Sequence, residues 1–188
     1  MQNKDAGDNT ATEFDQLYID VMLPHHASAI ALAQVAWPDM RDERLVRIAE
    51  NIISAHSAQR DEMAGYRTRF YGSADPAPMD DQMMHQVMEA MPNMSGPMDQ
   101  MAFLMDSDAM VAEFRAADNA DAAFIDLVIP HHQMAVAASE TAETQAVHSE
   151  IGRFAERVTS EERSEVERLQ EIRADMGEDV EPEVRPGF

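Results

Sequence analysis

Two similar eight-residue segments of this chain both begin with Ile-Asp and end in Pro-His-His. The first copy runs from Ile19 to His26 and the second from Ile125 to His132, so the offset is 106 positions (125 minus 19). The same offset pairs Asp15 with Asp121 without a gap. A chain that carries one unit twice folds most simply as two similar halves packed against each other.

Each copy is expected to form a helical hairpin, which is one long helix, a short break and a second long helix. Apolar residues recur at steps of three and four, as they do on the buried face of a helix. Breaks are expected at 37–39, where Pro38 follows Trp37, at the Gly- and Pro-containing segment 72–78, and near 144–147. Two antiparallel hairpins bury their apolar stripes most simply as an all-α four-helix bundle.

The chain length suits one domain with its own core. We predict a single domain over 1–188, with a first helical hairpin at 12–71, a methionine-rich helical insertion at 79–110, a second hairpin at 111–176 and a loose tail at 177–188.

The formal net charge is −22, because 36 Asp and Glu residues outnumber 14 Lys and Arg residues. This balance argues against nucleic acid as a partner, since phosphate binding requires a basic surface. No apolar stretch is long enough to span a membrane. The start of the chain lacks a signal peptide's apolar core, so the protein is either cytosolic or a mature form whose leader has been removed.

Polar residues interrupt the apolar stripes at the same depth in both halves. The second predicted helix carries His56 and Gln59 on its stripe, and the fourth carries Glu162 and Glu165 at the same offset of 106. Buried charges are costly unless they are paired or bound to a cation. We therefore predict a metal site built from or supported by His25, His26, His56, His131, His132, Glu162 and Glu165. Imidazole and carboxylate suit Cu(II), Zn(II) or Fe.

Pro24 and Pro130 directly precede the two histidine pairs. A proline inside a helix removes one backbone hydrogen bond and distorts the helix. The apolar pattern continues through both prolines, so we expect them inside helices, where the distortion helps to aim the histidines. The alternative is that each proline starts a helix.

The predicted insertion holds ten of the 16 methionines of the chain. Met84, Met88 and Met91 share a helical face, with His85 beside them. Thioethers favour Cu(I), and the chain has no cysteine to compete with them. A second, soft copper site is one interpretation, and ordinary packing of flexible methionines is the other.

The segment from Ile125 to Ala135, which includes Ile-Pro-His-His, resembles the hallmark of a bacterial domain-of-unknown-function family that includes CopM-type copper-binding proteins. The resemblance covers about 12–71 and 106–176. It implies a ferritin-like four-helix bundle, a periplasmic or extracellular location, and copper binding with a role in copper tolerance. Where that family typically carries Gln and Glu three residues apart, this chain has His56-Gln59 and Glu162-Glu165.

Three functions are compatible with these patterns. The leading one is a protein that sequesters copper, as Cu(I) or Cu(II), or exchanges it with a copper-donating or copper-accepting protein. The second is a di-iron-like oxidoreductase, which the lack of a Glu-x-x-His motif on the stripes disfavours. The third is a protein-interaction module without metal, in which the methionine-rich segment binds the partner. Neither the metal nor the oligomeric state follows from the sequence.

Overall fold

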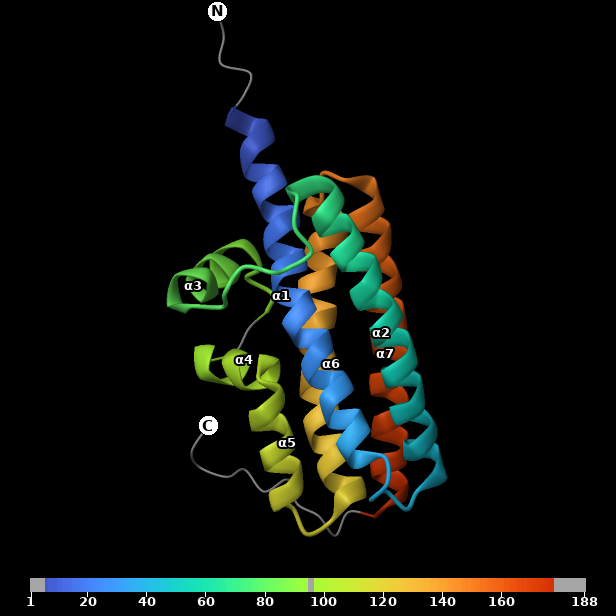
Figure 1. Cartoon of the computed structure of the whole chain (residues 1–188). Helices are drawn as coiled ribbons and strands as arrows, with labels where there is room; N and C mark the ends of the chain where they lie inside the picture. The colour runs from blue at the N-terminus through green and yellow to red at the C-terminus, as the bar shows by residue number, and fades with distance from the viewer. Residues whose placement is uncertain (1–5, 95–96, 178–188) are drawn as a thin grey trace, which may run out of the picture.

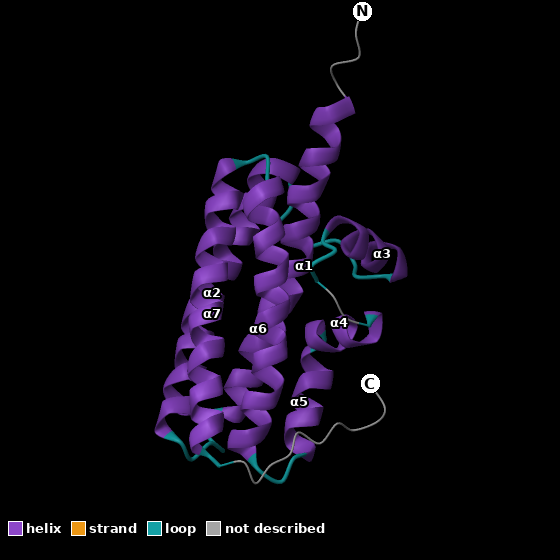
Figure 2. Ribbon diagram, turned by 180° about the vertical axis from the view of Figure 1, so that it is seen from behind, coloured by secondary structure: helices purple, strands orange, loops and turns teal. Residues whose placement is uncertain are grey.

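The computed structural model describes residues 6–94 and 97–177, with side chains described from residue 13 onward. Seven helices cover most of these residues, and the described part of the chain contains no strand (Figure 2). The all-helical prediction is confirmed. The helices are α1 (Ala6–Ala36), α2 (Glu43–Tyr71), α3 (Asp81–Ala90), α4 (Met98–Met105), α5 (Ser107–Ala116), α6 (Ala120–Gln145) and α7 (Ser149–Asp175).

Four long helices lie side by side and form the body of the molecule (Figure 1). Helix α1 packs against α2 and α6, and α7 packs against α6 and α2, so the four contacts close a ring. Helices α1 and α7 run in one direction, and α2 and α6 run in the other. Helices α3, α4 and α5 lie outside this ring and contact α1.

The ends of the long helices follow from local chemistry. Helix α1 ends at Ala36, immediately before the Trp-Pro-Asp break. The Asp42 side chain accepts a hydrogen bond from the first turn of α2, whose other end is closed by Gly72 at φ 82°, a conformation that glycine adopts without strain. Gly177 follows α7 with φ 85°. The predicted tail lies outside the described residues from 178 onward.

Residues separated by the offset of 106 also make equivalent contacts in the two halves of the molecule. Asp15 accepts hydrogen bonds from the backbone N–H groups of Val147 and His148, just before α7. Asp121 accepts the equivalent bonds from 41 and 42, just before α2. Each of these aspartates therefore ties the first helix of one hairpin to the start of the second helix of the other hairpin.

A second pair of contacts obeys the same offset. Arg67 of α2 forms a bidentate ion pair with Asp20 of α1 at 2.5 and 3.3 Å, and both residues are buried. Arg173 of α7 pairs with Asp126 of α6 at 3.1 Å, but this pair is partly exposed. Each hairpin thus contains one arginine–aspartate pair at this equivalent position, and only the first is shielded from water.

The methionine-rich segment contributes mainly to the core. Six of its methionines are buried, in α3, α4, α5 and the turn after α3: Met84, Met91, Met94, Met101, Met105 and Met110. They join one apolar cluster with the long helices. No helix among the described residues is both long enough and apolar enough to cross a membrane.

Candidate metal centre

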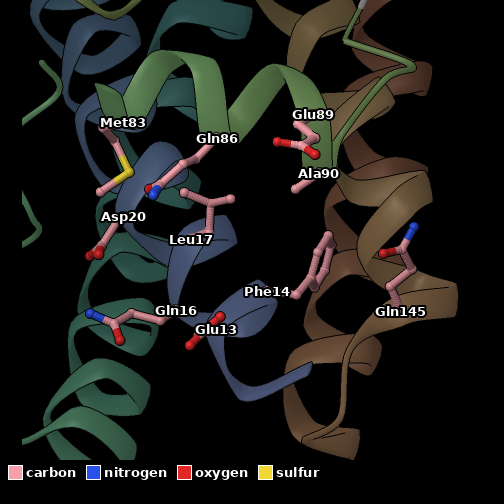
Figure 3. Close-up of a pocket in the computed structure, with 10 residues that line it drawn as sticks. All are labelled: Glu13, Phe14, Gln16, Leu17, Asp20, Met83, Gln86, Glu89, Ala90 and Gln145. Atoms are coloured by element: carbon pink, nitrogen blue, oxygen red, sulfur yellow. The ribbon is translucent and has the colours of Figure 1, made fainter. Parts of the chain in front are cut away.

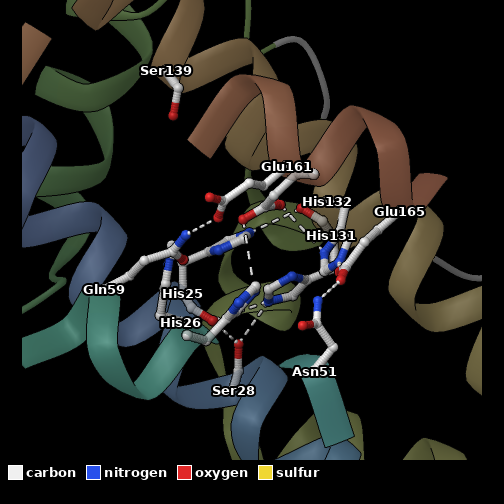
Figure 4. Close-up of polar contacts among 12 residues, drawn as sticks. His25, His26, Ser28, Asn51, Gln59, His131, His132, Ser139, Glu161 and Glu165 are labelled. Atoms are coloured by element: carbon white, nitrogen blue, oxygen red, sulfur yellow. Dashed lines mark hydrogen bonds and ion pairs between the residues drawn. The ribbon is translucent and has the colours of Figure 1, made fainter. Parts of the chain in front are cut away.

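A cluster of buried polar side chains lies inside the ring of four helices (Figure 4). Each long helix contributes two of them, and the exposure of every one is 9% or less. The eight residues are His25 and His26 of α1, His56 and Gln59 of α2, His131 and His132 of α6, and Glu162 and Glu165 of α7. Pro24 and Pro130 lie inside α1 and α6, as predicted.

Two of the histidines are held in the same way in the two halves. His26 Nε2 lies 2.8 Å from Gln59 Oε1, and His132 Nε2 lies 2.8 Å from Glu165 Oε2. An amide oxygen and a carboxylate only accept hydrogen bonds, so each Nε2 carries the proton and donates it. The Nδ1 lone pair of each ring is therefore available. A histidine that binds metal usually donates its other N–H in this way.

The other polar atoms of this part of the cluster lie close together, but they form no hydrogen bonds with one another. The Nδ1 atoms of His26 and His132, both ring nitrogens of His56 and both oxygens of Glu162 are buried and have no hydrogen-bond partner among the described residues. His56 Nε2 lies 3.6 Å from Glu162 Oε1, and His132 Nδ1 lies 3.3 Å from Oε2. One ligand atom each from His26, His56 and Glu162 lies within 4.8 Å of the other two.

Such a set of atoms is costly in a protein that binds nothing there. A buried polar group without a partner destabilises the fold by about 1–3 kcal/mol, and more if it is charged. A cation that accepts electron pairs from imidazole and carboxylate would satisfy several of these atoms together. The geometry can therefore hold one metal ion with nitrogen and oxygen ligands.

His25 and His131 form a separate pair beside this group. His25 Nε2 lies 2.9 Å from the carbonyl oxygen of His131, and His131 Nε2 lies 3.0 Å from the carbonyl oxygen of His25. Their ring centroids are 3.6 Å apart. Each Nε2–H thus donates to the opposite helix, while both Nδ1 atoms are buried without a partner among the described residues. These two rings join α1 to α6, whatever else they bind.

The protonation of the cluster follows from burial. Burial lowers the pKa of His26 to about 4, and the pKa values of His25, His56 and His131 are also well below the ordinary value for the same reason. These rings are neutral at pH 7 and can act as ligands. Burial raises the pKa of Glu162 to about 8, although nearby His132 opposes this shift.

His132 differs from the other four rings. Burial alone would lower its pKa, but the Glu162 and Glu165 carboxylates raise it above the ordinary value. Burial alone would raise the pKa of Glu165, but the hydrogen bonds from His132 and Asn51 and the nearby charges of His132 and Arg168 together lower it. His132 and the two glutamates therefore share protons, and a metal ion would replace a proton at His132 Nδ1.

Gln59 and Glu165, which orient His26 and His132, are themselves hydrogen-bonded to two further residues. Glu161 accepts a hydrogen bond from Gln59 Nε2 at 2.8 Å, and Asn51 donates one to Glu165. Each bond crosses between α2 and α7. Sequence analysis missed Asn51 and Glu161, because neither lies on an apolar stripe and neither has an equivalent in the other half. Nothing in the sequence alone distinguishes them from ordinary surface residues.

The structure does not bring the residues of the predicted soft site into one group. Met84 and Met91 are buried in the apolar core, whereas Met88 is 38% exposed. His85 is exposed, and its Nδ1 donates to the carbonyl oxygen of Asp81 at 2.6 Å. The buried face of α3 passes through Met84 and Val87 and continues to Met91, which follows the helix, and this leaves His85 and Met88 on the outer face. Copper binding by these four residues stays a prediction.

His148, immediately before α7, lies outside the buried histidine cluster. Its ring stacks on Phe70 with the ring centroids 3.8 Å apart, and its Nδ1 lies 2.7 Å from Asp15 Oδ2. It therefore serves the link between α1 and α7 described above.

A cavity of about 540 Å³ lies between α1 and α3, and none of its described lining residues is a histidine (Figure 3). Its polar lining includes Asp20, which is already paired with Arg67. The buried histidine cluster, rather than this cavity, has the unsatisfied atoms that call for a ligand.

A scan against protein-family models matches residues 15–173 to the family described as domain of unknown function DUF305. The chain belongs to the DUF305 family. The match spans both hairpins and the insertion. No curated protein matches the sequence.

Solved structures of the same fold include a CopM protein and other DUF305 proteins. CopM in its Cu(II)-bound form is 24% identical, with a TM-score of 0.66 over 87% of this chain and 97% of that one. A DUF305 protein from Streptomyces coelicolor, inferred to be secreted, is 21% identical, with a TM-score of 0.68 over 86% and 93%. A DUF305 fragment from Deinococcus radiodurans is 23% identical, with a TM-score of 0.65 over 85% and 94%. At these identities the likeness establishes the fold.

Proposed function

We propose that this DUF305 protein binds copper at the centre formed by His26, His56, His132 and Glu162, and that it stores the ion or passes it on. One observation carries the proposal. Imidazole nitrogens and a carboxylate converge inside the helix ring, buried and without protein partners among the described residues. His25 and His131 support the centre from the side, and Gln59 and Glu165 orient its rings.

Ligand chemistry favours copper among the candidates. Three imidazoles and one carboxylate suit Cu(II) or Zn(II), and Cu(II) binds such sites most tightly of the divalent first-row ions. CopM, which shares the fold, has been solved in Cu(I)-bound, Cu(II)-bound and silver-bound forms. The strongly negative charge of the chain raises the local concentration of any cation.

We further propose that the protein acts outside the cytoplasm, in copper tolerance, as a single-domain bundle of the ferritin-like type. Copper is then cargo rather than a catalytic group. The di-iron alternative would require more carboxylates: the two glutamates of this cluster come from one helix, and the facing positions hold His56 and Gln59. A metal-free interaction module would leave the unpaired atoms of the cluster unexplained.

The test is titration of the metal-free protein with Cu(II), Zn(II) and Fe(II), followed by stoichiometry and thermal shift. We expect Cu(II) to bind and raise the melting temperature, and Glu162→Gln, which keeps the side-chain size, to weaken binding at least tenfold. Glu171→Gln, the same change at an exposed glutamate of α7, is the matched control and should bind as the parent does. Paired Fe(II) ions with oxidase turnover would favour the enzyme, and no binding of any ion would refute the proposal.

A further inference from the structure

A second cavity, of about 230 Å³, lies between α4, α6 and the turn that follows α3. Three methionines line it: Met94 from the turn, Met101 from α4 and Met134 from α6. Each is at most 7% exposed. They come from three separate elements, so the periodicity of a single helix does not account for their lining the same cavity.

The rest of the lining suits a ligand of low charge. Amide side chains contribute the polar part, and none of the described lining residues is charged. Thioether sulfur is neutral and polarisable, and it prefers soft ions such as Cu(I). A hard divalent ion such as Mg²⁺ prefers carboxylate, carbonyl and water oxygens instead, and it would find no carboxylate among these residues.

The cavity opens to solvent on one side. Asn93, Gln100 and Gln133 of its lining are exposed, whereas Met94, Met101 and Met134 are buried. A cation can therefore reach the three thioethers from outside, past neutral amide side chains, without passing the histidine cluster.

The two halves of the molecule carry different residues at the position of Met134. By the offset of 106, Met134 corresponds to Ser28. The Ser28 hydroxyl lies 2.6 Å from the carbonyl oxygen of Leu104, which also lines the cavity, and 2.9 Å from His131 Nε2. Ser28 therefore connects the wall of the cavity to the buried histidine cluster.

We propose that Met94, Met101 and Met134 form a thioether site for a soft monovalent cation, with Cu(I) as its ion. The site is distinct from the histidine centre and uses none of its ligands. The proposal extends the function argued above and rests on it only for the choice of copper as the ion.

The experiment uses the full chain and Cu(I), kept reduced under argon and titrated in competition with a chromogenic Cu(I) chelator. The test variant is Met94→Leu/Met101→Leu/Met134→Leu, since leucine keeps the apolar volume and removes the sulfur. The matched control is Met40→Leu/Met63→Leu/Met110→Leu, which changes three buried methionines that do not line the cavity. Thermal melts of both variants verify that they are folded.

We expect the test variant to bind one equivalent of Cu(I) less than the parent, and to lose sulfur scatterers from the X-ray absorption spectrum of bound copper. The control should keep both. Equal Cu(I) stoichiometry and affinity in parent and test variant would overturn the proposal. Cu(II) titration of the same proteins separates the two sites: loss of Cu(I) in the test variant supports the thioether site even if Cu(II) never binds the histidines.

Discussion

At the scale of single residues, the candidate centre depends on which nitrogen of each histidine carries the proton. Gln59 and Glu165 fix that choice by accepting from Nε2, and the lone pairs of His26 and His132 are then on Nδ1. The ligand and the residue that orients it come from different helices in both halves. Correct assembly of the hairpins is therefore a condition for a competent centre.

Replacing Gln59 should weaken metal binding without removing a ligand. Gln59→Ala leaves His26 free to rotate and to change its proton position, and the loss of such a partner typically costs 10- to 100-fold in affinity. Gln59→Glu keeps an acceptor and should retain most of the affinity. Cu(II) competition titration measures both, with the exposed Gln170→Ala as control. Equal affinity for Gln59→Ala and the parent would show that the hydrogen bond does not position the ring.

At the scale of elements, each hairpin contains one arginine–aspartate pair at an equivalent position, and the two ion pairs differ mainly in their exposure. Arg67 and Asp20 are almost fully shielded, whereas 53% of the Asp126 side chain is exposed beside Arg173. A buried ion pair and a partly exposed ion pair therefore occupy equivalent positions in the same molecule, and their contributions to stability can be compared directly.

Arg67→Met should destabilise the metal-free protein by about 3–5 kcal/mol, because it leaves the Asp20 carboxylate buried without a counter-charge. Arg173→Met, the equivalent change in the second hairpin, should cost about 1 kcal/mol or less, because water solvates Asp126. Urea denaturation measures both free energies of unfolding. Similar costs for the two variants would show that burial does not set the strength of these pairs.

The sequence allowed the helices and the burial of the polar residues on their apolar stripes to be predicted, but it did not identify all the residues that contact them. The repeated Pro-His-His segments and the interruptions at 56 and 162 indicated a buried cluster, and these residues do meet. The Arg67 and Arg173 pairs could have been found by applying the offset of 106 to charged residues. The shared position of Met101 and Met134 at one cavity could not, because it depends on how α4 packs against α1 and α5, and a methionine pattern within one segment carries no information about that.

At the scale of the whole molecule, the cluster makes the stability of the metal-free protein depend on pH. The folded-state pKa values of His25, His26, His56 and His131 are lowered, so the unfolded chain binds protons more readily than the folded one. Their contribution to stability is present above the unfolded value of about 6.5 and is lost as the pH falls below it. Glu162, whose pKa is raised to about 8, acts in the opposite direction, since its contribution is lost as the pH rises.

The four histidines therefore oppose Glu162 and, close to pH 6.5, also His132, whose pKa is raised. The contribution of His132 is fully present below pH 6.5, so the melting temperature of the metal-free protein should fall between pH 6.5 and 5.5. A loss of about 1 kcal/mol corresponds to about 3 °C in a chain of this size, and we expect at least that. Glu162→Gln removes one opposing group and should make the fall steeper. Scanning calorimetry at several pH values provides the measurement, and a melting temperature that rises on acidification would contradict the assignment of neutral buried rings.

The facing positions 56 and 162 are occupied by different residues, a histidine and a glutamate, and this has a consequence for how such a centre can arise. A symmetric pair of separate, identical hairpins would have to present two histidines or two glutamates there. Joining both hairpins in one chain removes that restriction, so each side can be altered alone. Glu162→His would give the symmetric, all-nitrogen version, and we expect it to strengthen the preference for Cu(II) and Zn(II) over hard ions, whereas His56→Glu should shift the preference toward harder ions such as Mn(II). Because the two halves are covalently linked, the ligands at positions 56 and 162 can differ, and each can be changed without changing the other.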